Sequence, residues 1–303
     1  MYVADMHCDS LSCVEGDTGL VNDYNFSKKY PQLQFCAHFS EYGGRTPEVR
    51  RAELMRAFNI YLSECNRLDI KAVSDSQDLF RVTDGGVRSA VFTVEGGAGL
   101  LSSSRELDVL LQSGLLKVFG LTWDTNELAS GAWDEDDRGL TAEGRKMVSR
   151  LASAGVIIDV SHLSDRSFYE LFELSPYPHI ATHSNFREVC NSRRNLTRDM
   201  AKMIASRGGV IGINLYPGFL SENEATKDDI LRHIDYGLEL LGEEHIGFGF
   251  DIDGTDGKYP RGIDTRSSIH DEVIDLLLSQ YSLATVEKIA GLNIINFLKS
   301  NLI

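Results

Sequence analysis

The stretch Thr141–His162, TAEGRKMVSRLASAGVIIDVSH, contains one complete helix-and-strand unit of this chain. Thr141 stands where a helix cap is expected, and Met147 and Leu151 fall on one helical face, which predicts an amphipathic helix. The short β-branched run Val156–Val160 follows at once and predicts a buried strand. A histidine comes directly after that strand. The unit therefore predicts a helix followed by a strand, with a side chain capable of catalysis or metal binding at the carboxyl end of the strand.

Similar units recur along the whole chain. The expected strands are Tyr2–Cys8, Ala90–Val94, Lys117–Thr122, Val156–Val160, His179–Thr182, Val210–Leu215 and Ile246–Phe250, with a weaker candidate at Ile70–Val73. Strands that alternate with helices must pair in parallel. Gly96-Gly97-Ala98-Gly99 follows a strand but lacks the spacing of a dinucleotide-binding fingerprint. We therefore predict an α/β protein with a closed (β/α)8 TIM barrel rather than an open doubly wound sheet.

The chain length fits one such barrel. The chain has 303 residues, and barrels of this kind form single domains of about 250 residues or more. We predict a single barrel domain over residues 1–303. A polar stretch with little periodicity, at about residues 14–46, is expected to be a long loop insertion after the first strand, and helices are expected at about residues 270–299.

Composition narrows the classes of partner and compartment. The net charge of -15 would repel nucleic acid and anionic membranes, so neither is expected as a partner. The five cysteines are odd in number and form no CxxC pair, which favours a reducing compartment. The first residues lack the features of a signal peptide, and no run of about 18 apolar residues occurs. We expect a cytoplasmic protein with no membrane association.

Metal-binding side chains stand at the carboxyl ends of five of the predicted strands. They are His7, Asp9, Glu95, His162, His183 and Asp251. Active sites of parallel barrels form at the carboxyl ends of the strands, so these side chains should meet at one rim. Imidazole and carboxylate ligands suit Zn2+, with Mn2+, Co2+ or Fe2+ as alternatives. Even five of these six side chains exceed the number of ligands that one tetrahedral zinc ion takes. They suit two ions that share a carboxylate and hold a bridging hydroxide.

Short motifs around these residues resemble those of the membrane dipeptidase (renal dipeptidase) family. They are His7-Cys8-Asp9, Glu95-Gly96-Gly97, Asp159-Val160-Ser161-His162, Thr182-His183-Ser184, Ser192-Arg193-Arg194-Asn195 and Gly247-Phe248-Gly249-Phe250-Asp251-Ile252-Asp253-Gly254. Their order and spacing match over about residues 2–298. The resemblance implies a barrel of the metal-dependent hydrolase type, two Zn2+ ions per chain, a small dipeptide substrate and a homodimer.

The resemblance also implies how the metal ligands divide. His7 and Asp9 would bind one zinc ion, and His162 and His183 the other. Glu95 would bridge the two ions, which makes it a catalytic residue as well as a ligand. The ordered set of motifs is much more specific than any one of them, because a single histidine after a strand is usually a packed or capping residue.

Three further roles follow from the same resemblance. Asp251 would receive a proton from the bridging water and pass it to the leaving amine; Asp253 shares its strand parity and is the alternative. Arg194 would hold the carboxylate of the dipeptide, a task that suits a planar, permanently charged guanidinium. Tyr216 follows a strand and is expected either to line the pocket or to pack at its rim.

One position departs from the family pattern. Members such as the renal enzyme carry a histidine after the strand that matches Lys117–Thr122, where it polarises the scissile carbonyl. This chain has Trp123 there, in a Leu-Thr-Trp pattern of a bacterial-type member. We expect Trp123 to contact the substrate and Asn126 to donate a hydrogen bond instead. Asp5 shares strand parity with His7, so we expect it to point into the barrel and orient a metal ligand.

Three functions fit these residues. The first is a zinc dipeptidase that hydrolyses small dipeptides, including L-Xaa-D-Xaa dipeptides, by means of the bridging hydroxide. The second is another amidohydrolase-type reaction on the same barrel, such as hydrolysis of a lactone, a phosphotriester or an N-acyl amino acid. The third is a zinc-binding protein with weak catalysis, which Trp123 alone supports.

Overall fold

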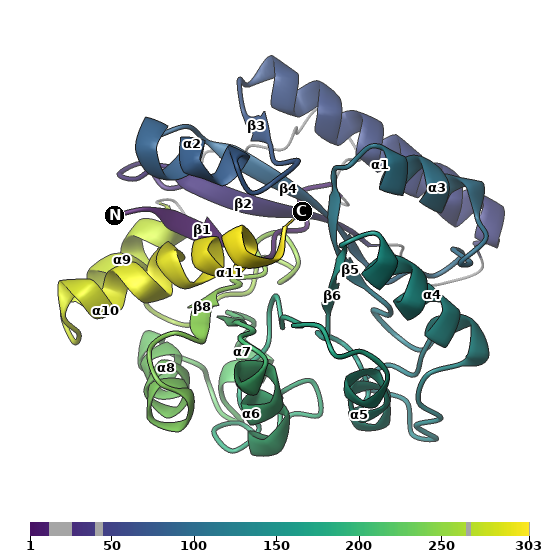
Figure 1. Cartoon of the computed structure of the whole chain (residues 1–303). Coiled ribbons are helices and arrows are strands. Elements are labelled where there is room, and N and C mark those ends of the chain that lie inside the picture. The colour runs from purple at the N-terminus through teal and green to yellow at the C-terminus, as the bar shows by residue number, and fades with distance from the viewer. Residues whose placement is uncertain (12–25, 40–44, 265–267, 303) are drawn as a thin grey trace.

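The computed structural model describes residues 1–11, 26–39, 45–264 and 268–302. Within these ranges, seven parallel strands lie side by side in the order β6-β5-β4-β2-β1-β8-β7 (Figure 1). They are β1 (Val3–Asp5), β2 (Gln32–Phe39), β4 (Ser89–Glu95), β5 (Leu116–Gly120), β6 (Ile157–Asp159), β7 (Ile211–Ile213) and β8 (Ile246–Phe248).

Two isolated bridges close this sheet into a barrel. Asp159 of β6 pairs with Ile180, and Ala181 pairs with Ile211 of β7, both in parallel. Ile180 and Ala181, between β6 and β7, thus occupy the eighth strand position of the barrel. They lie within the predicted strand His179–Thr182. The predicted closed α/β barrel is confirmed, and the open doubly wound sheet is excluded.

The strand β2 was not expected. It lies inside the stretch 14–46 that the sequence analysis takes for a loop insertion, so that expectation is wrong for residues 32–39; residues 14–25 and 40–44 lie outside the described ranges. Gln32 and Gln34 interrupt the apolar pattern. Both are buried because Gln32 donates to Gln34 at 2.8 Å and Gln34 donates to the Asp5 carbonyl at 3.3 Å. Ile70–Val73 contributes only β3 (Lys71–Ala72), which pairs with β4 outside the ring.

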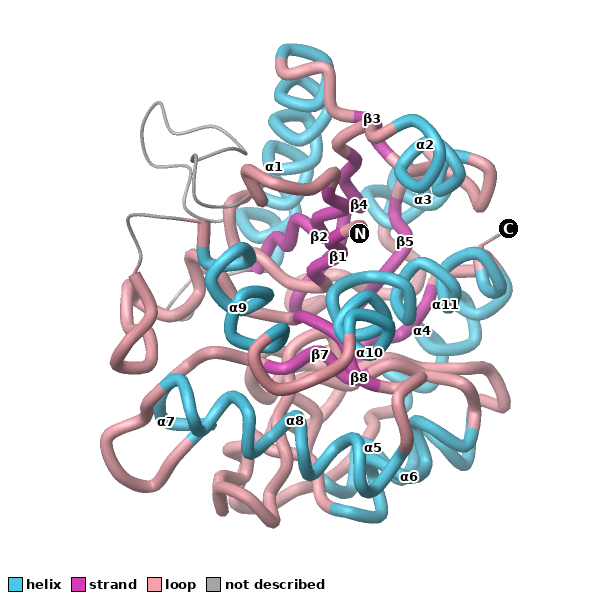
Figure 2. Tube along the Cα trace, turned by 90° about the vertical axis from the view of Figure 1, so that its left-hand side faces the viewer, coloured by secondary structure: helices cyan, strands magenta, loops and turns pink. Residues whose placement is uncertain are grey.

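Helices surround the strands of the barrel on the outside (Figures 1 and 2). They are α1 (Pro47–Arg67), α2 (Asp78–Gly85), α3 (Arg105–Gln112), α4 (Ala142–Ser153), α5 (Asp165–Leu174), α6 (Arg198–Ser206), α7 (Pro217–Leu220), α8 (Lys227–Leu241), α9 (Ile269–Leu278), α10 (Leu283–Glu287) and α11 (Asn293–Asn301), with a π-helical turn η1 (Lys288–Leu292) before α11. The Thr141 side chain accepts from the Gly144 N–H at 3.0 Å, so the predicted cap of α4 is confirmed. Helices are present over much of the range predicted at about 270–299.

Apolar side chains from the strands fill the interior of the barrel. They are Ala4, Met6, Leu33, Phe35, Val91, Val118, Ile157, Ile180 and Val210. Ile294 and Leu298 of α11 pack against the same cluster. A Cβ on Gly291 of η1 would lie 2.5 Å from the Tyr2 carbonyl, so this part of the chain presses on the start of β1. The end of the barrel at which the strands begin is therefore closed by the C-terminal helices, and the opposite rim is free to carry a site.

The N-terminal strand is regular only as far as Asp5, and the chain bends at Met6. Ala4 and Met6 belong to the interior cluster, whereas the Asp5 carboxylate contacts His270 of α9. The alternation that placed Asp5 on the same side as His7 therefore fails at the bend. The expectation that Asp5 points into the barrel is wrong.

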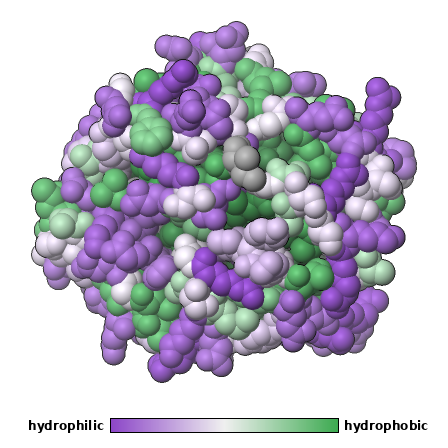
Figure 3. Space-filling model, viewed as in Figure 1, coloured by the Kyte–Doolittle hydropathy of each residue, from purple (hydrophilic) through white to green (hydrophobic). Residues whose placement is uncertain are grey.

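The face seen in Figure 3 is covered mostly by hydrophilic residues, with hydrophobic ones in scattered patches. This agrees with a chain that carries 45 acidic and 30 basic residues. Among the described residues, no helix combines the length and the apolar character needed to cross a bilayer.

Replacing the buried His179 by leucine should flatten the acid dependence of stability. Burial, together with the nearby Arg207 guanidinium, lowers the pKa of His179 to about 3. Since the folded-state pKa lies below the unfolded value of about 6.5, the neutral ring contributes stability above pH 6.5 that is lost as the pH falls towards 3. Urea unfolding of chelated protein from pH 7 to pH 4 should show His179→Leu losing up to about 1.4 kcal/mol less per pH unit than the parent. Parallel pH profiles would contradict this expectation.

Candidate functional site

The six predicted rim residues meet at the carboxyl ends of the strands. Glu95 is the last residue of β4. Each of the other five comes within four residues after the end of β1, β6, the Ile180–Ala181 strand position or β8. Five of them are buried, and His162 is partly buried. The barrel thus gathers, from positions 7 to 251, side chains that are far apart in the sequence.

Glu95 lies between the imidazoles. Its Oε1 is 2.7 Å from His162 Nε2 and 3.3 Å from His183 Nε2. The two imidazole Nε2 atoms are themselves 2.9 Å apart. Three ligand atoms that converge so closely surround a point at which one cation would contact all of them.

The other oxygen of Glu95 faces a second group. Glu95 Oε2 is 3.4 Å from His7 Nε2, which is 3.7 Å from Asp9 Oδ1. His7, Asp9 and Glu95 place one ligand atom each within 4.8 Å of one another, as do Glu95, His162 and His183. Glu95 therefore belongs to both groups. A third group, of His7, His183 and Asp251, converges as closely.

The electrostatics of this cluster are those of a site short of positive charge. Burial opposes protonation of His7, but Glu95 and Asp9 outweigh it and raise the pKa of His7 well above its usual value. Burial opposes ionisation of Glu95, yet the facing imidazoles lower its pKa well below the usual range. Burial and the Glu95 charge raise the pKa of Asp9. Carboxyl groups that compete for the same imidazoles would be relieved by a cation.

Buried ligand atoms without partners support the same conclusion. His7 Nε2, Asp9 Oδ1 and Glu95 Oε2 have no hydrogen-bond partner among the described residues. A buried polar atom without a partner is costly unless an ion or water satisfies it. The residues present therefore fit divalent cations of the kind that imidazole and carboxylate bind.

Thr182 and Asp159 orient the His183 imidazole, a role that no sequence pattern predicted. The Thr182 hydroxyl donates to Asp159 Oδ2 and lies 2.8 Å from His183 Nδ1. Because its single hydrogen goes to Asp159, the hydroxyl accepts from His183 Nδ1–H, which leaves the lone pair of Nε2 for a cation. Both residues stand in the motifs quoted above, beside His162 and His183, so their position was the available signal.

Asp251 lies at the edge of the cluster, with Oδ1 at 3.8 Å from His7 Nε2. Asn214, just beyond β7, donates from Nδ2 to Asp251 Oδ2 at 2.9 Å, a contact that the sequence analysis missed. Burial raises the pKa of Asp251 to about 6. Asp253 turns elsewhere, since its Oδ2 lies 3.8 Å from the Cys8 thiol. The backbone of Asp251 has φ of 60°, a left-handed conformation that the surrounding structure must hold in place.

A cleft of about 1090 Å³ opens over these groups, and its walls include Asp9, Glu95, His162, Arg194, Tyr216 and Asp251. Arg194 is 3% exposed and donates from Nη1 to Ser184 Oγ and from Nη2 to the His183 carbonyl, both at 3.0 Å. A guanidinium has five N–H donors, and these two contacts use only two of them. Tyr216 packs on Phe219 at 4.8 Å between ring centroids.

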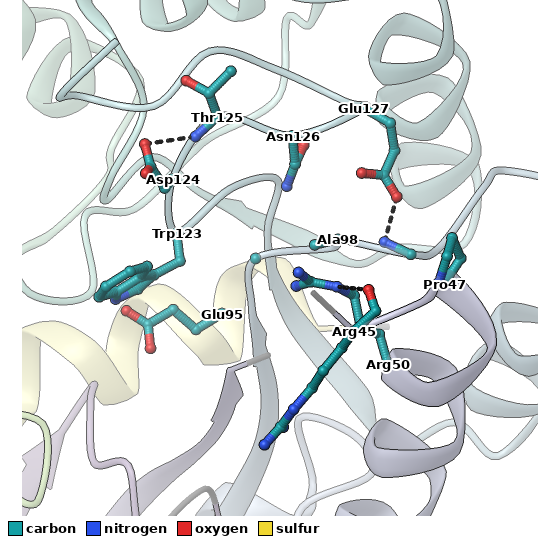
Figure 4. Close-up of a pocket in the computed structure, with 12 residues that line it drawn as sticks. Arg45, Pro47, Arg50, Glu95, Ala98, Trp123, Asp124, Thr125, Asn126 and Glu127 are labelled. Carbon is teal, nitrogen blue, oxygen red and sulfur yellow. Dashed lines mark hydrogen bonds between the residues drawn. The ribbon is translucent and has the colours of Figure 1, made fainter. Parts of the chain in front are cut away.

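Trp123 lines both this cleft and a smaller cavity of about 250 Å³. Its ring stacks on Phe39 and lies beside His162, at 5.8 Å between centroids in each case. Figure 4 shows Trp123 and Glu95 at one end of the smaller cavity and Arg50 towards the other. Asn126 also lines it, but its Nδ2 donates to the Leu121 carbonyl at 3.0 Å and its Oδ1 accepts from the Leu128 N–H at 2.8 Å. The amide of Asn126 is therefore engaged in its own turn.

Solved structures share the whole fold. A metallopeptidase from Rhodobacter sphaeroides, liganded with a phosphinate mimic of the dipeptide L-Ala-D-Ala, superposes with a TM-score of 0.86 at 23% identity and covers 99% of both chains. A metallopeptidase of family M19 called dipeptidase AC also gives a TM-score of 0.86, at 24% identity over 99% of this chain and 98% of its own. At these identities the likeness establishes the fold alone.

Sequence relatives match over different shares of their length. A Klebsiella pneumoniae protein encoded in the pqqA 5′ region is 31% identical over 223 residues, which are 66% of this chain and 82% of that protein. Human dipeptidase 3 is 33% identical over 199 residues, 62% of this chain and 39% of its own length. An uncharacterized dipeptidase of Schizosaccharomyces pombe is 31% identical over 166 residues, again 39% of its length. The chain spans less than half the length of these last two relatives.

The family model for membrane dipeptidase (peptidase family M19) matches residues 14–301. His7 and Asp9 precede the matched range, so their place in the site follows from the geometry rather than from this match. The matched range includes Glu95, His162, His183, Arg194 and Asp251. With that match over nearly its whole length, the chain belongs to the membrane dipeptidase family, peptidase family M19.

Proposed function

We propose that this protein is a zinc-dependent dipeptidase that hydrolyses the peptide bond of small dipeptides, including L-Xaa-D-Xaa dipeptides. The observation that carries the proposal is the convergence of three imidazole Nε2 atoms on the two oxygens of the buried Glu95 carboxylate. Membership of a dipeptidase family supports the reaction class. The bound L-Ala-D-Ala mimic of the Rhodobacter sphaeroides structure supports a D-residue at the second position.

Two ions per chain are proposed. Glu95, His162 and His183 would hold one, while His7, Asp9 and Glu95 would hold the other. Zn2+ suits this mixture of nitrogen and oxygen donors, and Mn2+, Co2+ or Fe2+ would also fit. When bound, such ions lower the pKa of water towards about 7 and polarise the scissile carbonyl. The protein's part is to hold the five ligands, and the Thr182 hydroxyl keeps the His183 lone pair directed at the site.

Asp251 is proposed to accept the proton of the attacking water and to return it to the leaving amine. The burial that raises its pKa to about 6 places it near neutrality, where a general base and acid works best. Asn214 donates to one carboxylate oxygen at 2.9 Å, and the other oxygen faces His7. Asp253, which the sequence left as an alternative, contacts Cys8 instead, and this favours Asp251.

The walls of the cleft suit a zwitterionic substrate with side chains. Arg194 is proposed to bind the substrate carboxylate with the N–H donors that its contacts with Ser184 and His183 leave over. Trp123 and Tyr216 are proposed to contact the substrate side chains, and Trp123 supplies an aromatic surface where renal-type members carry a histidine. We further propose that the protein acts as a cytoplasmic homodimer.

Arg194→Lys should weaken binding of the substrate carboxylate. Lysine keeps the charge but loses the fork of N–H donors and the contacts that orient it. A charge-assisted hydrogen bond contributes about 1.5–3 kcal/mol, so KM for a dipeptide should rise about 10- to 100-fold. Steady-state kinetics on the dipeptide and on its C-terminal amide provide the check. The variant should discriminate far less between the two substrates than the parent, and equal discrimination would contradict the role of Arg194.

The function itself is tested by hydrolysis of a panel of L-Xaa-L-Xaa and L-Xaa-D-Xaa dipeptides by protein loaded with Zn2+. The panel should include N-acyl amino acids and a lactone as substrates of other barrel hydrolases. Turnover of dipeptides would support the proposal and rank its substrates. Turnover confined to the N-acyl amino acids or the lactone would favour a different amidohydrolase. No turnover by protein with two bound zinc ions would favour a zinc-binding protein with weak catalysis.

A further inference from the structure

Asp5 and His270 form a buried pair on the outer side of the barrel strands. Asp5 is the last residue of β1 and His270 lies in the first turn of α9. Asp5 Oδ2 is 2.8 Å from His270 Nε2, and both side chains are 0% exposed. Neither residue belongs to the proposed metal ligands. A buried carboxylate is retained only where it is hydrogen-bonded, so its partners indicate its purpose.

The second carboxylate oxygen of Asp5 bonds to the backbone after β1 and to the backbone after β8. Asp5 Oδ1 accepts from the His7 N–H at 3.0 Å and from the Phe250 N–H at 3.1 Å. The ordinary ladder between β1 and β8 continues with Met6 N–H to the Phe248 carbonyl at 2.9 Å. Beyond that bond both strands leave the regular pattern, and one carboxylate oxygen takes the place of two ladder acceptors.

The two amides that Asp5 holds belong to residues at the site. His7 contributes Nε2 to the ligand cluster, and Phe250 immediately precedes Asp251. Asp5 Oδ1 therefore links the backbone of a proposed ligand to the backbone next to the proposed proton carrier. The left-handed φ of 60° at Asp251 makes such a restraint more important, because a free chain would relax from that conformation.

His270 in turn holds Asp5. Its ring packs on Phe250 with centroids 5.1 Å apart, and its Nε2 lies 3.4 Å from Gln32 Nε2. Gln34 Nε2 donates to the Asp5 carbonyl at 3.3 Å. His270 therefore holds the Asp5 carboxylate from α9, while Gln34 holds the Asp5 backbone from β2. These contacts also explain why β2 carries two buried glutamines.

We propose that Asp5 and His270 are a positioning pair, which sets the placement of His7 relative to Asp251 and thereby the geometry and affinity of the metal centre. The inference rests on the proposed metal centre. Changing residues that orient metal ligands typically lowers metal affinity or activity about 10- to 100-fold, and we expect an effect of that size from removing the Asp5 carboxylate.

The test uses the full chain loaded with Co2+, whose visible absorption spectrum reports ligand geometry. Asp5→Ala should weaken Co2+ binding about 10- to 100-fold and alter the spectrum. Asp5→Asn should restore most of both, since its side-chain oxygen can still accept from the two amides. His270→Leu, which keeps the carboxylate but removes the His270 partner of Oδ2, should give a smaller change in the same direction and covers the case in which Asp5→Ala does not fold.

Asp271→Ala is the matched control. Asp271 is a buried carboxylate on the same helix, but it accepts from Ser27 Oγ and the Lys28 N–H, away from His7 and Phe250. It should lower the thermal midpoint while the Co2+ spectrum and affinity stay those of the parent. Unchanged Co2+ binding in both Asp5→Ala and His270→Leu, or equal losses in the Asp271 control, would overturn the proposal. A parent chain that binds no Co2+ would overturn the metal centre and this inference with it.

Discussion

Replacing Asp251 by asparagine is expected to lower kcat for dipeptide hydrolysis by about 10²- to 10⁴-fold, the usual contribution of a positioned general acid and base. Asparagine has nearly the same shape and can still accept the hydrogen bond that Asn214 donates at 2.9 Å. It cannot take up or return a proton. Metal content should therefore stay that of the parent while turnover is lost, and steady-state kinetics together with metal analysis measure both.

Asp253→Asn is the natural comparison for that variant. Asp253 also lines the cleft, but its carboxylate contacts the Cys8 thiol rather than the imidazole of His7. Its replacement should change kcat only several-fold. Should Asp253→Asn instead abolish turnover while Asp251→Asn retains it, the proton carrier would be Asp253, the alternative that strand parity left open.

Loss of the metal ions is expected to remove dipeptide hydrolysis altogether, and Zn2+ should restore it. Ions that bind only the folded chain also stabilise it, by about 2.7 kcal/mol at a free concentration 100 times the dissociation constant. The thermal midpoint should therefore fall on chelation and recover with Zn2+. Glu95→Gln should mimic chelation, because Glu95 contributes to both groups of ligand atoms.

Atomic emission on the purified parent should find two metal ions per chain, and far fewer on Glu95→Gln. Asp251→Asn serves as the control that keeps its ions. Full activity after exhaustive chelation would contradict a metal-dependent mechanism. Retention of one ion by Glu95→Gln would mean that the carboxylate serves one ion rather than both.

The metal cluster could be predicted because its signal is positional. In a parallel barrel every strand ends at the same rim, so a histidine or carboxylate directly after a strand has only one place to go. This is why Glu95, His162 and His183, which are up to 88 residues apart in the numbering, were expected together and lie within 3.3 Å of one another. The barrel itself followed from the same alternation of strands and helices.

What failed depended on contacts that no local pattern encodes. β2 was missed because Gln32 and Gln34 are residue types common in loops. They are buried in the structure because they hydrogen-bond to each other, to Ser27 and to Asp5. Strand parity misplaced Asp5 because a bend at Met6 resets the alternation. Asn214 could not be assigned to Asp251 before β7 and β8 were known to lie side by side.

The position of β1 between β2 and β8 has a consequence for how the ribosome delivers this protein. β1 precedes the other described strands along the chain, yet one of its neighbours, β8, begins only at Ile246. Until then the nascent chain carries an open sheet edge, which is prone to pair with other chains. A chain that stalls before residue 246 keeps that edge uncovered, so synthesis, rather than the mature state, is the stage at which this barrel is most exposed to pairing with other chains.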